Sequence, residues 1–197
     1  MRGKEILGKM LLAAACVGVA LLVATVVLLG FRGQRSRSFP PLHLAARSGS
    51  VQAVTVLLDS GVGPEELDRG PNGWTPLLHA IHKDQLAVVR LLLARGADPN
   101  RLAVNGTSPL NLAASQGDLV TVRTLIAAGA RVEGRSGISA LLNAATGGHR
   151  QVVETLLTAA PGLRVPAGPR YWVARLLAHL RGDREMLALL ARVERRS

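Results

Sequence analysis

The residues with the most obvious capacity for chemistry are five histidines and one cysteine, Cys16, spread along the chain. His79 and His82 lie three residues apart in a predicted helix, a spacing that can turn two imidazoles toward one metal ion. A protein zinc site usually needs further ligands, and the sequence offers none nearby. There is also no phosphate-binding Gly-Lys loop and no Gly-x-Ser-x-Gly nucleophile elbow. We therefore predict that the protein is not an enzyme and holds no metal and no cofactor.

A pattern of residue types returns about every 33 residues, which is typical of a stacked repeat array. Each unit has an alanine four residues before a small or polar turn residue and a leucine eight residues after it. The turn residues are Gly49, Asp84, Gly117, Gly148 and Gly182; the alanines are Ala45, Ala80, Ala113, Ala144 and Ala178; the leucines are Leu57, Leu92, Leu125, Leu156 and Leu190. Such arrays usually serve as binding surfaces.

The second and third units show the pattern most completely. The second opens with Gly73-Trp74-Thr75-Pro76-Leu77 and ends with Leu91-Leu92-Leu93-Ala94-Arg95-Gly96-Ala97-Asp98; the third opens with Gly106-Thr107-Ser108-Pro109-Leu110. These segments resemble ankyrin repeats. The resemblance implies an all-α repeat solenoid of helix-turn-helix repeats joined by hairpin loops, with four repeats over residues 38–163. Pro in the first helical turn and Gly after the second helix suit that structure.

The last part of the chain, residues 164–197, is predicted to be a loop and a degenerate fifth repeat that acts as a C-terminal cap. It keeps Ala178, Gly182 and Leu190 but has lost the opening motif, and a Pro-rich spacer over 161–169 precedes it. A cap should present a polar outer face. The side chains that could provide that face are Arg184, Arg192, Glu194, Arg195 and Arg196. Two earlier repeats also depart from the pattern. The first opens with Phe39-Pro40-Pro41, and the fourth has Ala140 where a proline is usual.

Residues 10–31 carry no charged side chain and are long enough to cross a bilayer as one transmembrane signal-anchor helix. A basic tail, residues 1–9, precedes this segment, and a basic tether, residues 32–37, follows it. A cleaved signal peptide would have a shorter apolar region. A lipoprotein box at Cys16 would be followed by a polar segment. We favour the anchor, with both alternatives left open.

The orientation of this single-pass membrane protein is weakly determined, because three basic residues flank each end of the span. The short basic N-terminal tail favours an extracytoplasmic repeat domain, which would be periplasmic in a bacterium. The spacing of Ala14 and Gly18 could also support a weak homodimer through the transmembrane helix.

The chain has a formal net charge of +11. Its 24 Lys and Arg residues are scattered, which argues against a dedicated nucleic-acid surface. The predicted partners are therefore a protein of unknown identity and, through residues 10–31, a membrane.

The resemblance places partner contacts ten residues before each turn residue. These five positions hold three of the five aromatic side chains of the chain. This column reads Phe39, Trp74, Thr107, Ile138 and Trp172, and the flanking exposed candidates are His82, Lys83, Arg101 and Arg135. Aromatic anchors dominate interface energies, which favours a binding edge. The competing interpretation is that Phe39 and Trp172 only seal the two ends of the stack.

Two functions follow. The first is a membrane-tethered adaptor or scaffold, a protein-binding module that captures a protein partner on its concave edge. The alternative is a stoichiometric protective or inhibitory subunit of an extracytoplasmic enzyme, which would change the activity or lifetime of that enzyme.

Overall fold

The computed structural model describes residues 40–194. The predicted tail, membrane segment and tether, together with Phe39, lie outside the described residues. The described part forms ten helices and no strand. Their bounds are Pro41–Ser48 (α2), Val51–Asp59 (α3), Pro76–His82 (α4), Leu86–Ala94 (α5), Pro109–Gln116 (α6), Leu119–Ala127 (α7), Gly134–Gly147 (α8), Arg150–Ala159 (α9), Pro169–Leu180 (α10) and Arg184–Glu194 (α11).

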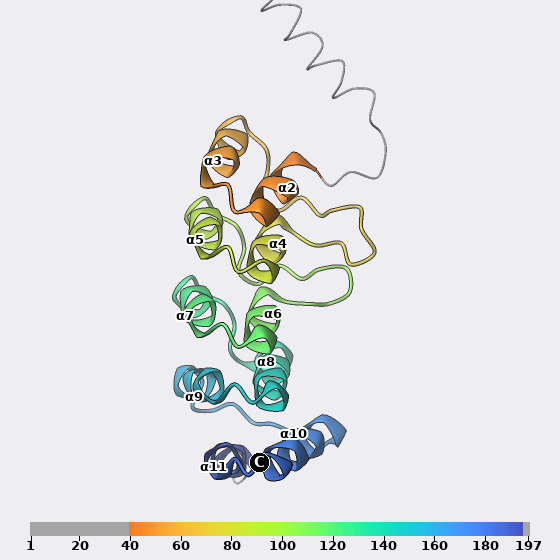
Figure 1. Cartoon of the computed structure of the whole chain (residues 1–197), viewed down its shortest axis with the longest axis vertical. Helices are drawn as coiled ribbons and strands as arrows, with labels where there is room; N and C mark the ends of the chain where they lie inside the picture. Colours follow the sequence, from red (N-terminus) through yellow and green to blue (C-terminus); the bar gives the residue numbers. More distant parts are fainter. Residues whose placement is uncertain (1–39, 195–197) are drawn as a thin grey trace, which may run out of the picture. The chain divides into compact units, whose positions relative to one another are not determined.

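The helices stack in two rows, as Figure 1 shows. The first helices of the pairs, α2, α4, α6, α8 and α10, form an inner row, and α3, α5, α7, α9 and α11 form an outer row. The long loops between α3 and α4 and between α5 and α6 extend beyond the inner row. This is the all-α repeat solenoid expected from the sequence.

Local capping explains where the early helices begin. The Thr75 hydroxyl accepts a hydrogen bond from the Leu78 amide at 3.3 Å at the start of α4. The Ser108 hydroxyl accepts one from the Asn111 amide at 3.2 Å at the start of α6. A proline stands at the next position in both helices, where its fixed φ suits a helix and its missing N–H costs nothing.

The recurring turn residue has a backbone reason. Gly49, Gly117, Gly148 and Gly182 all have positive φ, between 68° and 80°, in the left-handed region that ends one helix and admits the next. Asp84 occupies the same place in the second repeat with φ of 56°, and it is the one non-glycine residue of the described chain with positive φ.

The core is made of small and aliphatic side chains. The five alanines of the pattern are buried, as are Leu92, Leu125, Leu156 and Leu190. The alanines let neighbouring inner helices approach closely, while each buried leucine contributes about 1.5–3 kcal/mol relative to leaving it exposed. Tyr171 is the one aromatic side chain among the fully buried residues of the described part.

The predicted binding column is not uniform. Trp74 and Thr107 lie in loops just before α4 and α6, whereas Ile138 lies inside α8 and Trp172 inside α10. The fourth repeat has no Thr-Pro pair to start its first helix at Ala140, so α8 begins six residues earlier, at Gly134. The residues of the column therefore lie in loops in the second and third repeats and on helices in the fourth and fifth, and their role in binding a partner stays a prediction.

The hairpin loops that the resemblance implies turn at Asn72-Gly73 and Asn105-Gly106. Gly73 and Gly106 have φ of 55° and 79°, and the Ala103 amide donates to the Thr107 carbonyl at 3.0 Å across the second turn. The predicted spacer before the fifth helix pair contains no helix or strand from 160 to 168. None of the described helices is long and apolar enough to cross a membrane.

Candidate protein-binding surface

A cluster of polar and aromatic side chains joins the first two repeats; we call His43, Asp68, Trp74, His79 and His82 the polar cluster. His43, Asp68 and His79 are buried, Trp74 is half-buried and His82 is exposed. The centre of the polar cluster is Asp68, whose Oδ2 accepts from Nε2 of His79 at 2.6 Å. The other carboxylate oxygen accepts from the amides of Gly70 and Trp74, at 2.9 and 3.1 Å. One side chain thus holds the long loop before α4 against that helix.

His43 ties the same loop to the first repeat. Its Nε2 lies 2.8 Å from the carbonyl of Glu66 and 3.1 Å from that of Trp74, so this nitrogen carries the proton and donates to both. The ring of His43 also lies edge-on to that of His79, with centroids 5.6 Å apart. The loop is therefore anchored from both neighbouring helices, α2 and α4.

Burial lowers the pKa of His43, and the nearby His79 lowers it further. Burial also lowers the pKa of His82, with the positive charge of Lys83 as the next cause. For Asp68, burial raises the pKa, but hydrogen bonds from His79 and from two backbone amides outweigh it and leave the pKa lowered. The polar cluster consequently favours a neutral His43 and an ionised Asp68.

Trp74 has a structural role as well as a half-exposed surface. Its ring packs edge-on against His79 and His82, with centroids 5.3 and 5.0 Å apart. Its Nε1 is buried and has no hydrogen-bond acceptor in the described part of the chain. The half-buried ring also lines a small hollow with Pro71 and Asn72. That Trp74 contacts a protein partner stays a prediction.

A second surface feature lies between α8 and α10, on the inner row. It is a groove of about 510 Å³ lined by Gly134, Arg135, Ile138, Ser139, Leu142, Pro166, Gly168, Pro169, Arg170 and Tyr171. We call it the α8–α10 groove. It brings together two residues of the predicted site, Arg135 and Ile138. The guanidinium of Arg170 is held beside it by a hydrogen bond to Asn143 Oδ1 at 2.6 Å.

The remaining predicted site residues are more dispersed. His82 and Lys83 are exposed at the end of α4, and Arg101 is exposed in the loop before α6. Thr107 is half-buried, and its amide donates to Asn105 Oδ1 at 3.0 Å. Trp172 is exposed on α10. The structure therefore pairs Trp74 with His82 and Ile138 with Arg135, and it does not bring the predicted residues into one site.

Sequence reasoning missed Asp68, Leu142, Arg170 and Tyr171. Asp68 precedes the Thr-Pro pair by several residues, and no local signal connects it to His79. The groove residues Pro166 and Pro169 belong to the spacer, whose irregular path was predicted but whose position against α8 depends on packing. A proline often begins a helix, so Pro169 could have been used to predict that Tyr171 lies in the first turn of α10.

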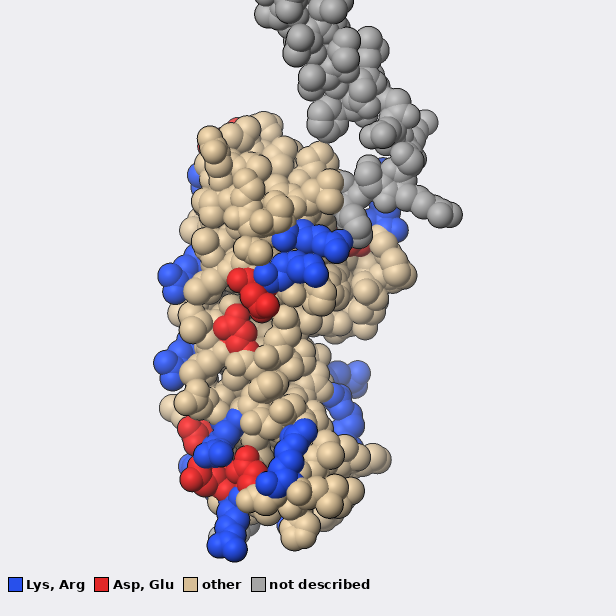
Figure 2. All heavy atoms as spheres, in the orientation of Figure 1, with Lys and Arg blue, Asp and Glu red and all other residues tan. Residues whose placement is uncertain are grey.

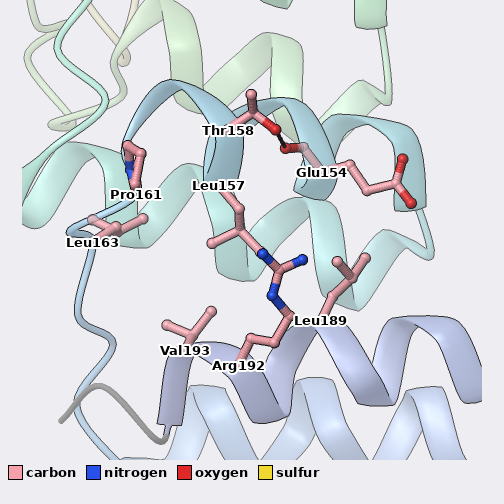
Figure 3. A pocket seen from close by; sticks show the side chains of 8 residues that line it. All are labelled: Glu154, Leu157, Thr158, Pro161, Leu163, Leu189, Arg192 and Val193. Carbon is pink, nitrogen blue, oxygen red and sulfur yellow. Dashed lines mark hydrogen bonds between the residues drawn. The ribbon is translucent and has the colours of Figure 1, made fainter.

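The outer row has its own pocket, between α9 and α11 (Figure 3), of about 450 Å³. Leu157, Leu189 and Val193 form its apolar part, and the Arg192 side chain extends across it toward Leu157. None of the predicted site residues lines this pocket.

Charged side chains do not concentrate on one element. On the face shown in Figure 2, Lys and Arg side chains are spread over several repeats and are interrupted by acidic ones. Among the residues that the structure describes, no group of three or more His, Cys, Asp or Glu side chains is placed to hold a metal ion.

Two models of known families match the chain. One, described as ankyrin repeats in three copies, matches residues 11–103, and one described as an ankyrin repeat matches residues 105–135. The chain contains ankyrin repeats. Ankyrin repeats form protein–protein interaction modules, so a role in binding a protein follows from the family.

Curated relatives share a repeat segment with this ankyrin-repeat chain. Ankyrin repeat protein nuc-2 of Neurospora crassa is 43% identical over 63 residues, 32% of this chain and 6% of that protein. B-cell lymphoma 3 protein homolog of Mus musculus is 39% identical over 59 residues, 30% of this chain and 13% of that protein. Mitochondrial disaggregase of Bos taurus is 37% identical over 89 residues, 45% of this chain and 13% of that protein. The chain thus spans at most 13% of the length of these relatives.

Proposed function

We propose that this chain is a membrane-tethered adaptor whose ankyrin-repeat domain captures a protein partner along the inner row of helices. The observation that carries the proposal is the α8–α10 groove, where Ile138 and Leu142 form an apolar floor beside Arg135 and Arg170. A concave apolar surface with a few placed polar groups is the usual form of a binding site.

The groove favours a particular kind of segment. Two exposed arginines at an apolar groove suit a peptide that inserts an aliphatic or aromatic side chain and carries a carboxylate close to it. Trp74, farther along the inner row, offers a half-exposed ring for a second contact with the same partner.

Tethering and location rest on the sequence. In this proposal residues 10–31 span the membrane, residues 32–37 link the span to the repeats, and the repeat domain lies outside the cytoplasm. The partner would then be a membrane or extracytoplasmic protein.

Quantitative capture of proteins by the full chain in native membranes tests the groove. Arg135→Ala combined with Ile138→Ala should reduce partner capture about tenfold or more, because groove anchors carry much of an interface energy. Val120→Ala, on an exposed site of the outer helix α7, is the matched control and should leave capture unchanged. Equal capture by the double variant, with a helical circular dichroism spectrum like that of the wild type, would show that the groove is the wrong surface.

Reporters fused to the C-terminus, active on only one side of the membrane, test the tether and its orientation. We expect the protein to be found in the membrane fraction, with its C-terminus outside the cytoplasm. A cytoplasmic C-terminus would overturn the proposed location. An enzyme in the captured fraction whose activity changes on binding would favour the protective or inhibitory subunit over the adaptor.

A further inference from the structure

Both ends of the described repeat array expose apolar side chains. On α10, Leu176 is 56% exposed, with Trp172, Val173 and Leu180 exposed beside it. Of the residues expected to form the polar outer face of the cap, Arg184 and Arg192 are exposed on α11, and Arg195 and Arg196 lie outside the described residues. Terminal repeats normally present polar outer faces. The apolar face of α10 is therefore a candidate contact surface.

Comparison between repeats shows which way this face of α10 points. The position six residues before the turn residue is buried at His43, Leu78 and Leu142 and half-buried at Asn111. In the last repeat the same position is Leu176, which is exposed. The fifth helix pair is the one with no following pair in the described chain. This column therefore faces the next repeat.

The opposite column faces the preceding repeat. The position five residues before the turn residue is buried at His79 and half-buried at Leu112, Asn143 and Leu177. In the first repeat it is Leu44, which is 47% exposed. No described helix precedes α2 on that side.

Within the chain these two columns contact each other. The ring of His43, six before its turn residue, lies 5.6 Å from that of His79, five before the next. In the same register, Asn143 Nδ2 donates to Asn111 Oδ1 at 2.5 Å. The stacking of repeats thus joins the six-before position of one repeat to the five-before position of the next.

We propose that copies of this chain associate head to tail, with α10 of one copy packed on α2 of the next. In this register Leu176 of one copy meets Leu44 of the other, so the interface continues the stacking already present inside each chain. The two ends present different surfaces, which makes the contact heterologous and extends the array instead of closing it as a symmetric dimer. The contact leaves the α8–α10 groove open and goes beyond the proposed function.

Sedimentation equilibrium of the full chain in density-matched detergent tests the contact. Leu44→Asp and Leu176→Asp should each weaken association about tenfold or more, because an unpaired carboxylate would be buried against a leucine. Val120→Asp places the same charge on an exposed apolar site away from both ends and should associate like the wild type. An equimolar mixture of the two end variants should form a one-to-one complex, because one intact Leu176–Leu44 contact remains.

Several results would overturn the proposal. A wild-type chain that stays monomeric would exclude it, and leave α10 to a helix of another protein. Association lost in Leu176→Asp but kept in Leu44→Asp would indicate a symmetric α10 contact. Association unchanged in both variants would assign it to another segment, such as residues 10–31. An end-variant mixture that stays monomeric, when the wild type associates, would also contradict the head-to-tail register.

Discussion

The first and last junctions between repeats share one stacking geometry but use different chemistry. Between α2 and α4, the polar cluster holds a long loop through a buried carboxylate and two imidazoles. Between α8 and α10, a Pro- and Gly-rich loop passes an apolar groove, and Arg170 donates to Asn143 Oδ1 while Arg181 donates to the Thr146 carbonyl. The polar junction is demanding in geometry and sensitive to protonation, whereas the apolar one leaves space for a ligand.

The largest expected effect is at the centre of the polar cluster. Asp68→Ala should lower the free energy of unfolding by about 2–4 kcal/mol, because the His79 ring and two backbone amides lose a charged acceptor in a buried site. Chemical denaturation measures it. Asp59→Ala is the matched control; it removes an exposed ion pair with Arg95 and should cost less than about 1 kcal/mol. Equal losses for the two variants would show that the polar cluster adds no special stability.

The next effect concerns the start of α8, which shapes the groove. An alanine Cβ at Gly137 would lie 1.6 Å from the Val132 carbonyl oxygen, so the backbone must shift. Gly137→Ala should therefore destabilise the protein by about 2 kcal/mol, although alanine is the better helix former by about 1 kcal/mol. Gly162→Ala, where a Cβ meets nothing within 4 Å, is the control and should be nearly neutral by thermal denaturation. If Gly137→Ala stabilised the protein, the Val132 carbonyl would not lie close to Gly137 at the start of α8.

A smaller effect is expected from the buried phenol at the apolar junction. The Tyr171 hydroxyl donates to the Leu190 carbonyl at 3.2 Å, linking α10 to α11. Tyr171→Phe keeps the ring and should lower the free energy of unfolding by about 1 kcal/mol. Urea denaturation would reveal it, with Trp172→Phe as the control on an exposed neighbour. An unchanged midpoint for Tyr171→Phe would show that this hydrogen bond is not important for stability.

The smallest effect separates the two junctions by pH. Because the folded pKa of His43 lies below its ordinary 6.5, the unfolded chain takes up the proton first as the pH falls. This contribution to stability is complete above pH 6.5 and is lost as the pH drops through the folded pKa. The pKa of His82, whose ring contacts that of Trp74, is also lowered. His82 therefore becomes protonated below pH 6.5 as well.

The two tryptophans report the junctions separately. In Trp172→Phe, the fluorescence of Trp74 should change with a midpoint below pH 6.5, because a protonated imidazole in ring contact quenches the indole. In Trp74→Phe, the fluorescence of Trp172 should change less over that range. His82→Gln in the Trp172→Phe background should remove most of the Trp74 change. Parallel curves for the two tryptophans would contradict the distinction between the junctions.

The helix pairs could be predicted because their signals are local. Thr75 with Pro76, and Ser108 with Pro109, start helices through contacts within four residues. The start of α8 could not be predicted from the repeat register. Once the Thr-Pro pair is missing, the helix extends backward until the turn at Glu133 and Gly134, and Ile138 moves from a loop onto a helix.

The candidate site depended more heavily on packing. The repeat pattern predicts partner contacts at Arg135 and Ile138, and both residues line the α8–α10 groove. The other wall of that groove comes from Pro166 to Tyr171, about 30 residues later in the chain, and exists only because α10 stacks on α8. The contact of Asp68 with His79 likewise crosses from a loop to a helix.

The sequence by itself determined the repeat register, the pairing of helices and the positive-φ turns, because each depends on residue types that lie close together in the chain and recur from one repeat to the next. The tertiary structure decided which polar side chains became buried partners, where a groove stayed open and which apolar columns were left uncovered at the two ends of the described array. Those features depend on the approach of one repeat to the next, and burial is a property of the assembled stack and not of any single segment.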